Sequence, residues 1–127
     1  MNRIRLVVLL FLISVGMQLH ANVNEITQAF ARGDLSKIEG FLNNNVELTI
    51  ENSSNSCDKC RAKALLAEFF RKNRPSNYSL TNKTERGGAA IILGNLYTNT
   101  GEFTLFILTQ KNMQKELIHQ VKITYKK

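Results

Sequence analysis

Residues 89–125 have the sequence AAIILGNLYTNTGEFTLFILTQKNMQKELIHQVKITY. Apolar residues recur there at about every second position, which is the period of a β-strand with one buried face. Two short polar breaks, Asn99-Thr100-Gly101 and Asn112-Met113, interrupt the alternation where hairpin turns are expected. The stretch therefore predicts three strands of an antiparallel meander, over residues 89–98, 102–111 and 116–125.

Two helices and one strand are expected in the first part of the chain. Residues 22–32 place apolar side chains at helical spacing, and Gly33 is suited to end that helix. Asp34 can cap a second short helix that stops before Asn43. Strict alternation of apolar and polar residues then predicts a half-buried strand over residues 46–51.

The longest helix is expected at residues 58–73, after a polar loop over 52–56. Its apolar stripe consists of Ala62, Leu65, Leu66, Phe69 and Phe70. Pro75 prevents the helix from continuing, and a further strand is expected over residues 78–83. Helices early and strands late are typical of an α+β fold with the helices on one face of a sheet.

The composition limits the function classes. The chain has 127 residues, of which 43% are hydrophobic, and this length predicts a single folded domain. One proline and seven glycines exclude a collagen-like or proline-rich protein. Two cysteines are too few for a disulfide scaffold or a four-cysteine zinc site. We expect neither a metal nor a cofactor.

The first 21 residues have the order of a secretory signal peptide. Two arginines precede an apolar run, and the small residue Ala21 closes the segment. From Leu6 to Leu19 there are 14 residues, whereas a membrane-spanning helix needs about 20. We therefore expect cleavage near Ala21, a mature domain over residues 22–127 with no membrane span, and a location in the periplasm or outside the cell. Retention as a membrane anchor is the alternative.

The charge does not point to nucleic acid. The chain carries 17 basic and 10 acidic residues, and removal of Arg3 and Arg5 leaves 15 basic residues and a net charge of +5. These basic residues are scattered along the sequence, as on an ordinary solvated surface. We expect no nucleic-acid partner.

The order of these elements resembles the nuclear transport factor 2-like fold, which is also described as cystatin-like. The segments AFARGDLSKI at 29–38, VELTI at 46–50 and the helix from Ala62 to Phe70 carry the resemblance. The chain from Asn22 onward is most similar to an uncharacterised family of secreted bacterial domains, domain of unknown function 4783. The resemblance implies three N-terminal helices packed on a curved, mostly antiparallel sheet. It also implies an open-mouthed cavity and often a dimer through the sheet, but no agreed substrate or catalytic residue.

Cys57-Asp58-Lys59-Cys60 places two thiols at the start of the long helix. A helix N-terminus lowers the pKa of a thiol, and export favours an oxidised pair. The chain lacks tryptophan, and its single proline follows the helix directly, which is unlike a thioredoxin site. A structural disulfide, two free thiols and a redox-active pair are the alternatives. Helical geometry places Cys60 toward solvent.

Three residues are candidates for lining the cavity: His119, Tyr97 and Phe69. Strand alternation puts His119 on the same face as Leu117, Val121 and Ile123, so we expect it to point into the interior. A lone histidine among apolar neighbours is more often a packing residue than a catalyst. No acidic residue is expected to point inward.

The strands over 89–93 and 103–108 are apolar on both faces, which indicates that the outer face of the sheet is covered. Self-association as a homodimer or coverage by the chain's own termini would account for this. We expect a non-catalytic module that binds a small apolar ligand, a peptide or a protein. The alternatives are a thiol–disulfide protein using Cys57 and Cys60, and an isomerase or dehydratase acting in the cone.

Overall fold

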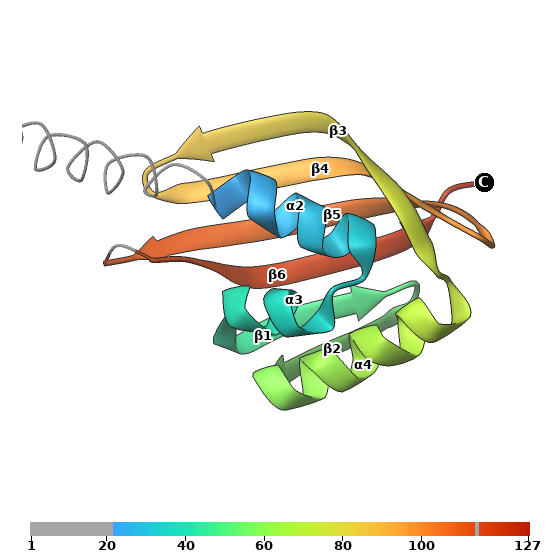
Figure 1. The fold of residues 1–127 in the computed structure, drawn as a ribbon. Coiled ribbons are helices and arrows are strands. Elements are labelled where there is room, and N and C mark those ends of the chain that lie inside the picture. The colour runs from blue at the N-terminus through green and yellow to red at the C-terminus, as the bar shows by residue number, and fades with distance from the viewer. Residues whose placement is uncertain (1–21, 114) are drawn as a thin grey trace, which may run out of the picture.

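The computed structural model describes residues 22–113 and 115–127, so the predicted signal segment at 1–21 lies outside the described residues. The elements are α2 (Asn22–Arg32), α3 (Leu35–Phe41), β1 (Leu42–Ile50), β2 (Ser53–Asp58), α4 (Lys59–Lys72), β3 (Pro75–Arg86), β4 (Ala89–Thr98), β5 (Gly101–Asn112) and β6 (Lys115–Tyr125). Figure 1 shows the three helices on the same side of a curved sheet. None of these described helices has the length and apolar character needed to cross a membrane.

The six strands form one sheet in the order β2-β1-β6-β5-β4-β3. The last four strands pair antiparallel with their neighbours in the chain, which confirms the predicted meander. β1 lies parallel to β6 and antiparallel to β2, so the two halves of the chain join in one sheet. The fold is α+β with a mostly antiparallel sheet, as expected.

The strand boundaries in the polar segments differ from the prediction. Residues 53–58, predicted largely as a loop, form β2, and β1 begins at Leu42, before the three asparagines. β3 is also longer than expected and starts at Pro75. β2 and β3 are the outer strands of the sheet and are largely exposed. Such edge strands form by backbone hydrogen bonding to one neighbour, which hydrophobic periodicity does not reveal.

Local capping fixes the helix ends, as the sequence predicted for Gly33 and Asp34. Gly33 follows α2 with a φ of 63°, a left-handed conformation that glycine adopts readily. The carboxylate of Asp34 accepts a hydrogen bond from the backbone N–H of Lys37 at 3.3 Å, at the start of α3. Asp58 does the same for Arg61 at 2.8 Å, at the start of α4. These bonds satisfy amides that have no partner within the helix.

Aromatic rings fill the space between the helices and the sheet. The ring of Phe69 lies edge-on to Phe103 at a centroid distance of 5.0 Å and to Phe70 at 5.6 Å. Phe70 in turn contacts Phe30 of α2 at 6.4 Å. All four side chains are at most 7% exposed. The predicted apolar stripe of the long helix is therefore part of the core.

Candidate functional site

The two faces of the sheet have different surroundings. Fully buried aliphatic side chains cover the face under the helices: Ile92, Leu96, Leu105, Ile107, Val121 and Ile123. In the described part of the chain, Thr109 is the one buried polar side chain. The opposite face, which we call the open face, carries the alternate residues, and Ile91 there is 41% exposed. The interior is thus apolar, and the open face carries accessible side chains.

His119 lies on the open face, so its predicted inward orientation is wrong. β6 pairs Ile118 with Thr109 and Gln120 with Leu108, and no residue of β5 stands opposite His119. This β-bulge shifts the alternation by one residue, so Ile118 is buried in place of His119. His119 instead lines a hollow of about 280 Å³ on the open face. Periodicity alone assumes an unbroken strand and therefore misplaced this side chain.

The other two cavity candidates do not line an interior hollow together with His119. Tyr97 is 37% exposed and stands between Asn77 of β3 and Glu102 of β5. Because Tyr97 alternates with the buried Leu96, its side chain belongs to the open face. Phe69 packs in the aromatic core. The three predicted residues are therefore not brought together.

Tyr78, on β3, packs against the core on the helix side of the sheet. It lies against Gly94 of β4, where an added Cβ would collide with the Tyr78 hydroxyl and with the backbone oxygen of Ser79. The hydroxyl is buried and has no hydrogen-bond partner among the described residues. Burial raises the pKa of Tyr78 to about 12, so it stays uncharged at neutral pH. Tyr78 also borders a hollow of about 150 Å³ between α2 and β3.

Both cysteines are free thiols in the structure. Cys57, on β2, is only 7% exposed and belongs to the core, whereas Cys60, on the first turn of α4, is exposed as expected. Burial raises the pKa of Cys57, and the nearby Arg61 offsets part of that rise. A raised pKa reduces the thiolate fraction, which makes Cys57 a poor nucleophile. No group of three or more potential metal ligands forms among residues 22–113 and 115–127.

Glu116 is an exception to the expectation that no acidic residue points inward. Because of the bulge, it alternates with the buried Ile118, and its Oε1 accepts a hydrogen bond from the Thr109 hydroxyl at 3.0 Å. Thr109 is itself fully buried. Glu116 therefore lies at the end of the inner face, and only the position of the bulge could have revealed this.

A shallow hollow of about 510 Å³ lies on the open face across β4, β5 and β6. Its lining consists of Leu93, Thr104, Phe106, Gln120, Lys122 and Thr124. Leu93 pairs with Phe106, and Phe106 pairs with Lys122, so these three side chains form one row across adjacent strands. Leu93 and Phe106 are half-buried although the helices pack on the other face.

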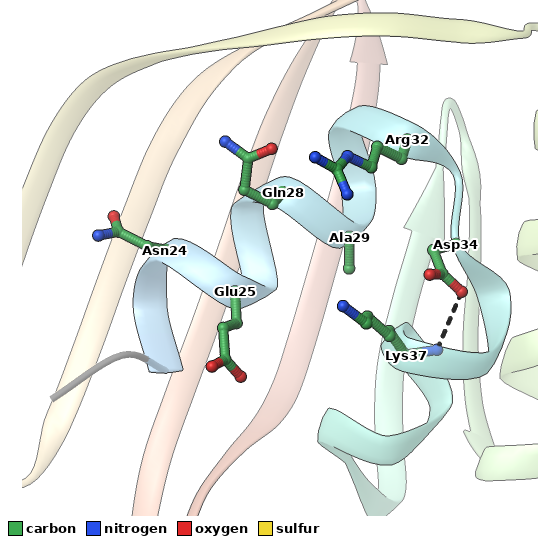
Figure 2. A pocket seen from close by; sticks show the side chains of 7 residues that line it. All are labelled: Asn24, Glu25, Gln28, Ala29, Arg32, Asp34 and Lys37. Carbon is green, nitrogen blue, oxygen red and sulfur yellow. Dashed lines mark hydrogen bonds between the residues drawn. The ribbon is translucent and has the colours of Figure 1, made fainter. Parts of the chain in front are cut away.

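A further hollow, of about 260 Å³, lies between α2 and the start of α3. Figure 2 shows Arg32 and Lys37 on either side of Ala29, and the hydrogen bond from the Lys37 backbone to Asp34. Glu25 is the second acid of the lining. Two positive and two negative groups therefore balance one another, and the hollow has no clear preference for a charged ligand.

Comparison with known families identifies the chain. The sequence profile of the family described as Domain of unknown function (DUF4783) matches residues 23–124. The chain belongs to the DUF4783 family. This confirms the family that the sequence resembles. No curated protein shows significant similarity to the chain.

Solved structures of DUF4783 proteins share the fold. A family member from Bacteroides ovatus is 28% identical with a TM-score of 0.78, over 81% of this chain and 94% of that one. Another from Bacteroides fragilis is 29% identical with a TM-score of 0.76, over 80% and 96% of the two chains. An NTF2-like protein of unknown function from Cytophaga hutchinsonii is 13% identical, with a TM-score of 0.59 over 82% and 86%. This DUF4783 protein therefore has the nuclear transport factor 2-like fold.

Proposed function

We propose that this protein is an exported, non-catalytic interaction module that binds a second copy of itself through the open face of its sheet. One observation carries the proposal. Ile91, Leu93 and Phe106 form an apolar surface, called here the apolar patch, on the face opposite the three helices. Isolated exposed apolar residues are ordinary, but a contiguous group on adjacent strands is typical of an interaction surface.

The surroundings of the apolar patch have the composition of a protein interface. Leu108 and Gln120 continue the row of Ile91, and Asn95, Thr104 and Thr124 form the next row beyond Leu93 and Phe106. These flanking side chains are mostly uncharged and polar. An apolar centre with few charges and a polar rim is the usual anatomy of a protein–protein contact.

The charges on this face suit a second copy. Lys122 lies in the row of Phe106, and Glu47 pairs with Gln120 in the adjacent row. In a two-fold contact each surface meets itself, so a face that carries both signs can pair them reciprocally. The net charge of +5 on the mature chain therefore does not oppose this contact locally.

The open face of the sheet is also large enough for a stable dimer contact. Six strands spaced about 4.8 Å apart and about ten residues long cover on the order of 900 Å². A stable interface needs roughly 800 Å² on each partner. A contact that used most of the open face would meet this requirement.

The interior supports a role without catalysis. General acid–base chemistry needs a positioned ionisable group within hydrogen-bond reach of a substrate. The core residues described above are aliphatic and aromatic, and His119, the base that the isomerase alternative requires, lies on the open face. Of the polar groups on the inner face, Thr109 and the Tyr78 hydroxyl are uncharged, and Glu116 lies at its end with its carboxylate hydrogen-bonded to the Thr109 hydroxyl.

The test is the mass of the protein in solution. We expect sedimentation and light scattering to give twice the mass of one chain at micromolar concentration. Phe106→Arg should shift the protein to a monomer with unchanged circular dichroism, since the charge would be buried in the contact. Ile91→Lys, at a more exposed position, serves as a second variant if Phe106→Arg folds poorly.

Gln28→Arg is the matched control, because it adds the same charge on the exposed side of α2, away from the sheet face. It should leave the dimer intact. A wild-type protein that stays monomeric at about 100 µM, or a dimer that survives both open-face substitutions, would overturn the proposal.

Export is tested separately. The support is the order of charged, apolar and small residues in the first 21 positions. Intact mass of the protein from the cell envelope fraction should correspond to a chain that starts near Asn22. The mass of the complete 127-residue chain, found in the cytoplasm, would contradict export.

A further inference from the structure

The pairing of β6 with its two neighbouring strands, β1 and β5, is interrupted at His119. Between β1 and β6, Leu42 pairs with Ile118 and the next pair is Glu47 with Gln120. Four residues of β1 therefore stand opposite a single residue of β6. β5 also has no residue opposite His119. The backbone of His119 is therefore unpaired with both neighbouring strands, β1 and β5. Bulges of this kind commonly redirect a side chain at a binding site.

This interruption borders the hollow of about 280 Å³ on the open face. Side chains from β1, β2 and β6 supply its polar lining: Asn43, Asn45, Glu47, Ser56, His119 and Gln120. Leu108 of β5 adds an apolar wall. The hollow thus joins residues that are more than 70 positions apart in the sequence, and no linear motif predicts it.

Few of these polar groups form hydrogen bonds with other groups of the protein. The amide nitrogen of Asn43 donates to the backbone oxygen of Asn45 at 3.2 Å and lies 3.5 Å from Nδ1 of His119. Within the described residues, no hydrogen bond engages the side chains of Asn45, Glu47 or Gln120. Their donors and acceptors are therefore free to bind a ligand.

The chemistry of the lining selects the ligand class. Side-chain amides and the serine hydroxyl each offer donors and acceptors, and neutral imidazole offers one of each. A ligand hydroxyl also donates and accepts, so it can satisfy such groups in either direction. The lining has no lysine or arginine, and Glu47 would repel an anion. The apolar wall suits the C–H face of a sugar ring.

We propose that this hollow, the His119 site, binds a neutral, hydroxyl-rich ligand of the saccharide class. The site lies at the β1–β2 side of the open face, whereas the apolar patch lies on β4 and β5. Gln120 is the residue that the site shares with the larger hollow. The inference does not need the proposed dimer, although a contact over most of the open face would cover part of the site.

Titration with methyl α-glucoside and N-acetylglucosamine, followed by amide NMR of the purified protein, tests the proposal. Shifts confined to residues 43–47, 56, 108 and 119–120 are expected, with a millimolar dissociation constant because the hollow is shallow and open. Asn45→Ala should weaken binding at least about fivefold, which is the loss of roughly one hydrogen bond. Asn82→Ala, on exposed β3, is the matched control and should bind like the wild type.

The oligomeric state and the sugar-induced shifts are separate measurements, so a monomer that shows the shifts would overturn only the dimer, and a dimer without them would overturn only this site. Absence of shifts with both sugars would overturn the proposal. So would equal binding by Asn45→Ala, or shifts of the same residues with methylammonium instead of sugar, since a cation would be held by Glu47 alone.

Discussion

The two faces of one sheet differ in how their residues are held. Ile92 and Ile91 are adjacent in β4, yet Ile92 is fully buried under the helices and Ile91 is 41% exposed. The helix-covered face packs aliphatic side chains against an aromatic core, and its register is fixed by that burial. The open face has no such constraint from within the chain. The difference indicates that stability resides mainly on the covered face and that the open face is accessible for the proposed contacts.

The largest expected effect on stability comes from substituting the adjacent isoleucines, one of which lies on each face. Ile92→Ala should lower the free energy of unfolding by about 2–4 kcal/mol, because it leaves a cavity in the core. Ile91→Ala should cost about 1 kcal/mol or less, since its side chain is partly solvated in the folded state. Urea unfolding at low protein concentration measures both without a contribution from association. Equal losses would show that the open face is as tightly packed as the core.

A smaller effect is expected at the contact between β3 and β4. Gly94→Ala should destabilise the fold by about 1–3 kcal/mol, because the new methyl group would overlap Tyr78 and the backbone of Ser79. Gly40→Ala is the control, since nothing lies within 4 Å of its Cβ position in α3. That change should stabilise the protein by up to about 1 kcal/mol. A neutral Gly94→Ala would mean that Tyr78 moves aside at little cost.

The smallest effect concerns reactivity and not stability. Cys60 should react with a thiol reagent at pH 8 at least about tenfold faster than Cys57, because burial both shields Cys57 and raises its pKa. In Cys60→Ser only Cys57 remains, and it should react slowly until urea unfolds the protein and exposes it. Two equally fast thiols would place Cys57 at the surface. No reaction before reduction would show that the pair is bonded, which would favour the disulfide alternative.

Much of the architecture was predictable because its causes are local. The limits of α2, the cap at Asp34, and the meander of β3 to β6 all depend on short-range spacing of apolar residues, caps and turns. The orientation of α4 was also predictable, because a buried stripe repeats with the period of the helix. β2 was missed, since an exposed edge strand with serine and asparagine has no apolar period.

The candidate site was less predictable. The sequence singled out His119, but strand alternation placed it on the wrong face because no local signal marks the bulge. Its neighbours Asn43, Glu47 and Ser56 come from strands whose pairing is set far along the chain. Tyr97 and Phe69 were likewise grouped with His119, although Tyr97 lies elsewhere on the open face and Phe69 lies in the aromatic core.

The sequence by itself determined the class of fold, the order of its elements and most of the core, because hydrophobic period and capping act between residues that are close in the chain. Only the tertiary structure decided which face each side chain of β6 presents, which strands border it and where hollows open. Those features depend on strand register, and register is a property of two strands together. A single missing partner at His119 was enough to move the candidate site from the interior to the open face.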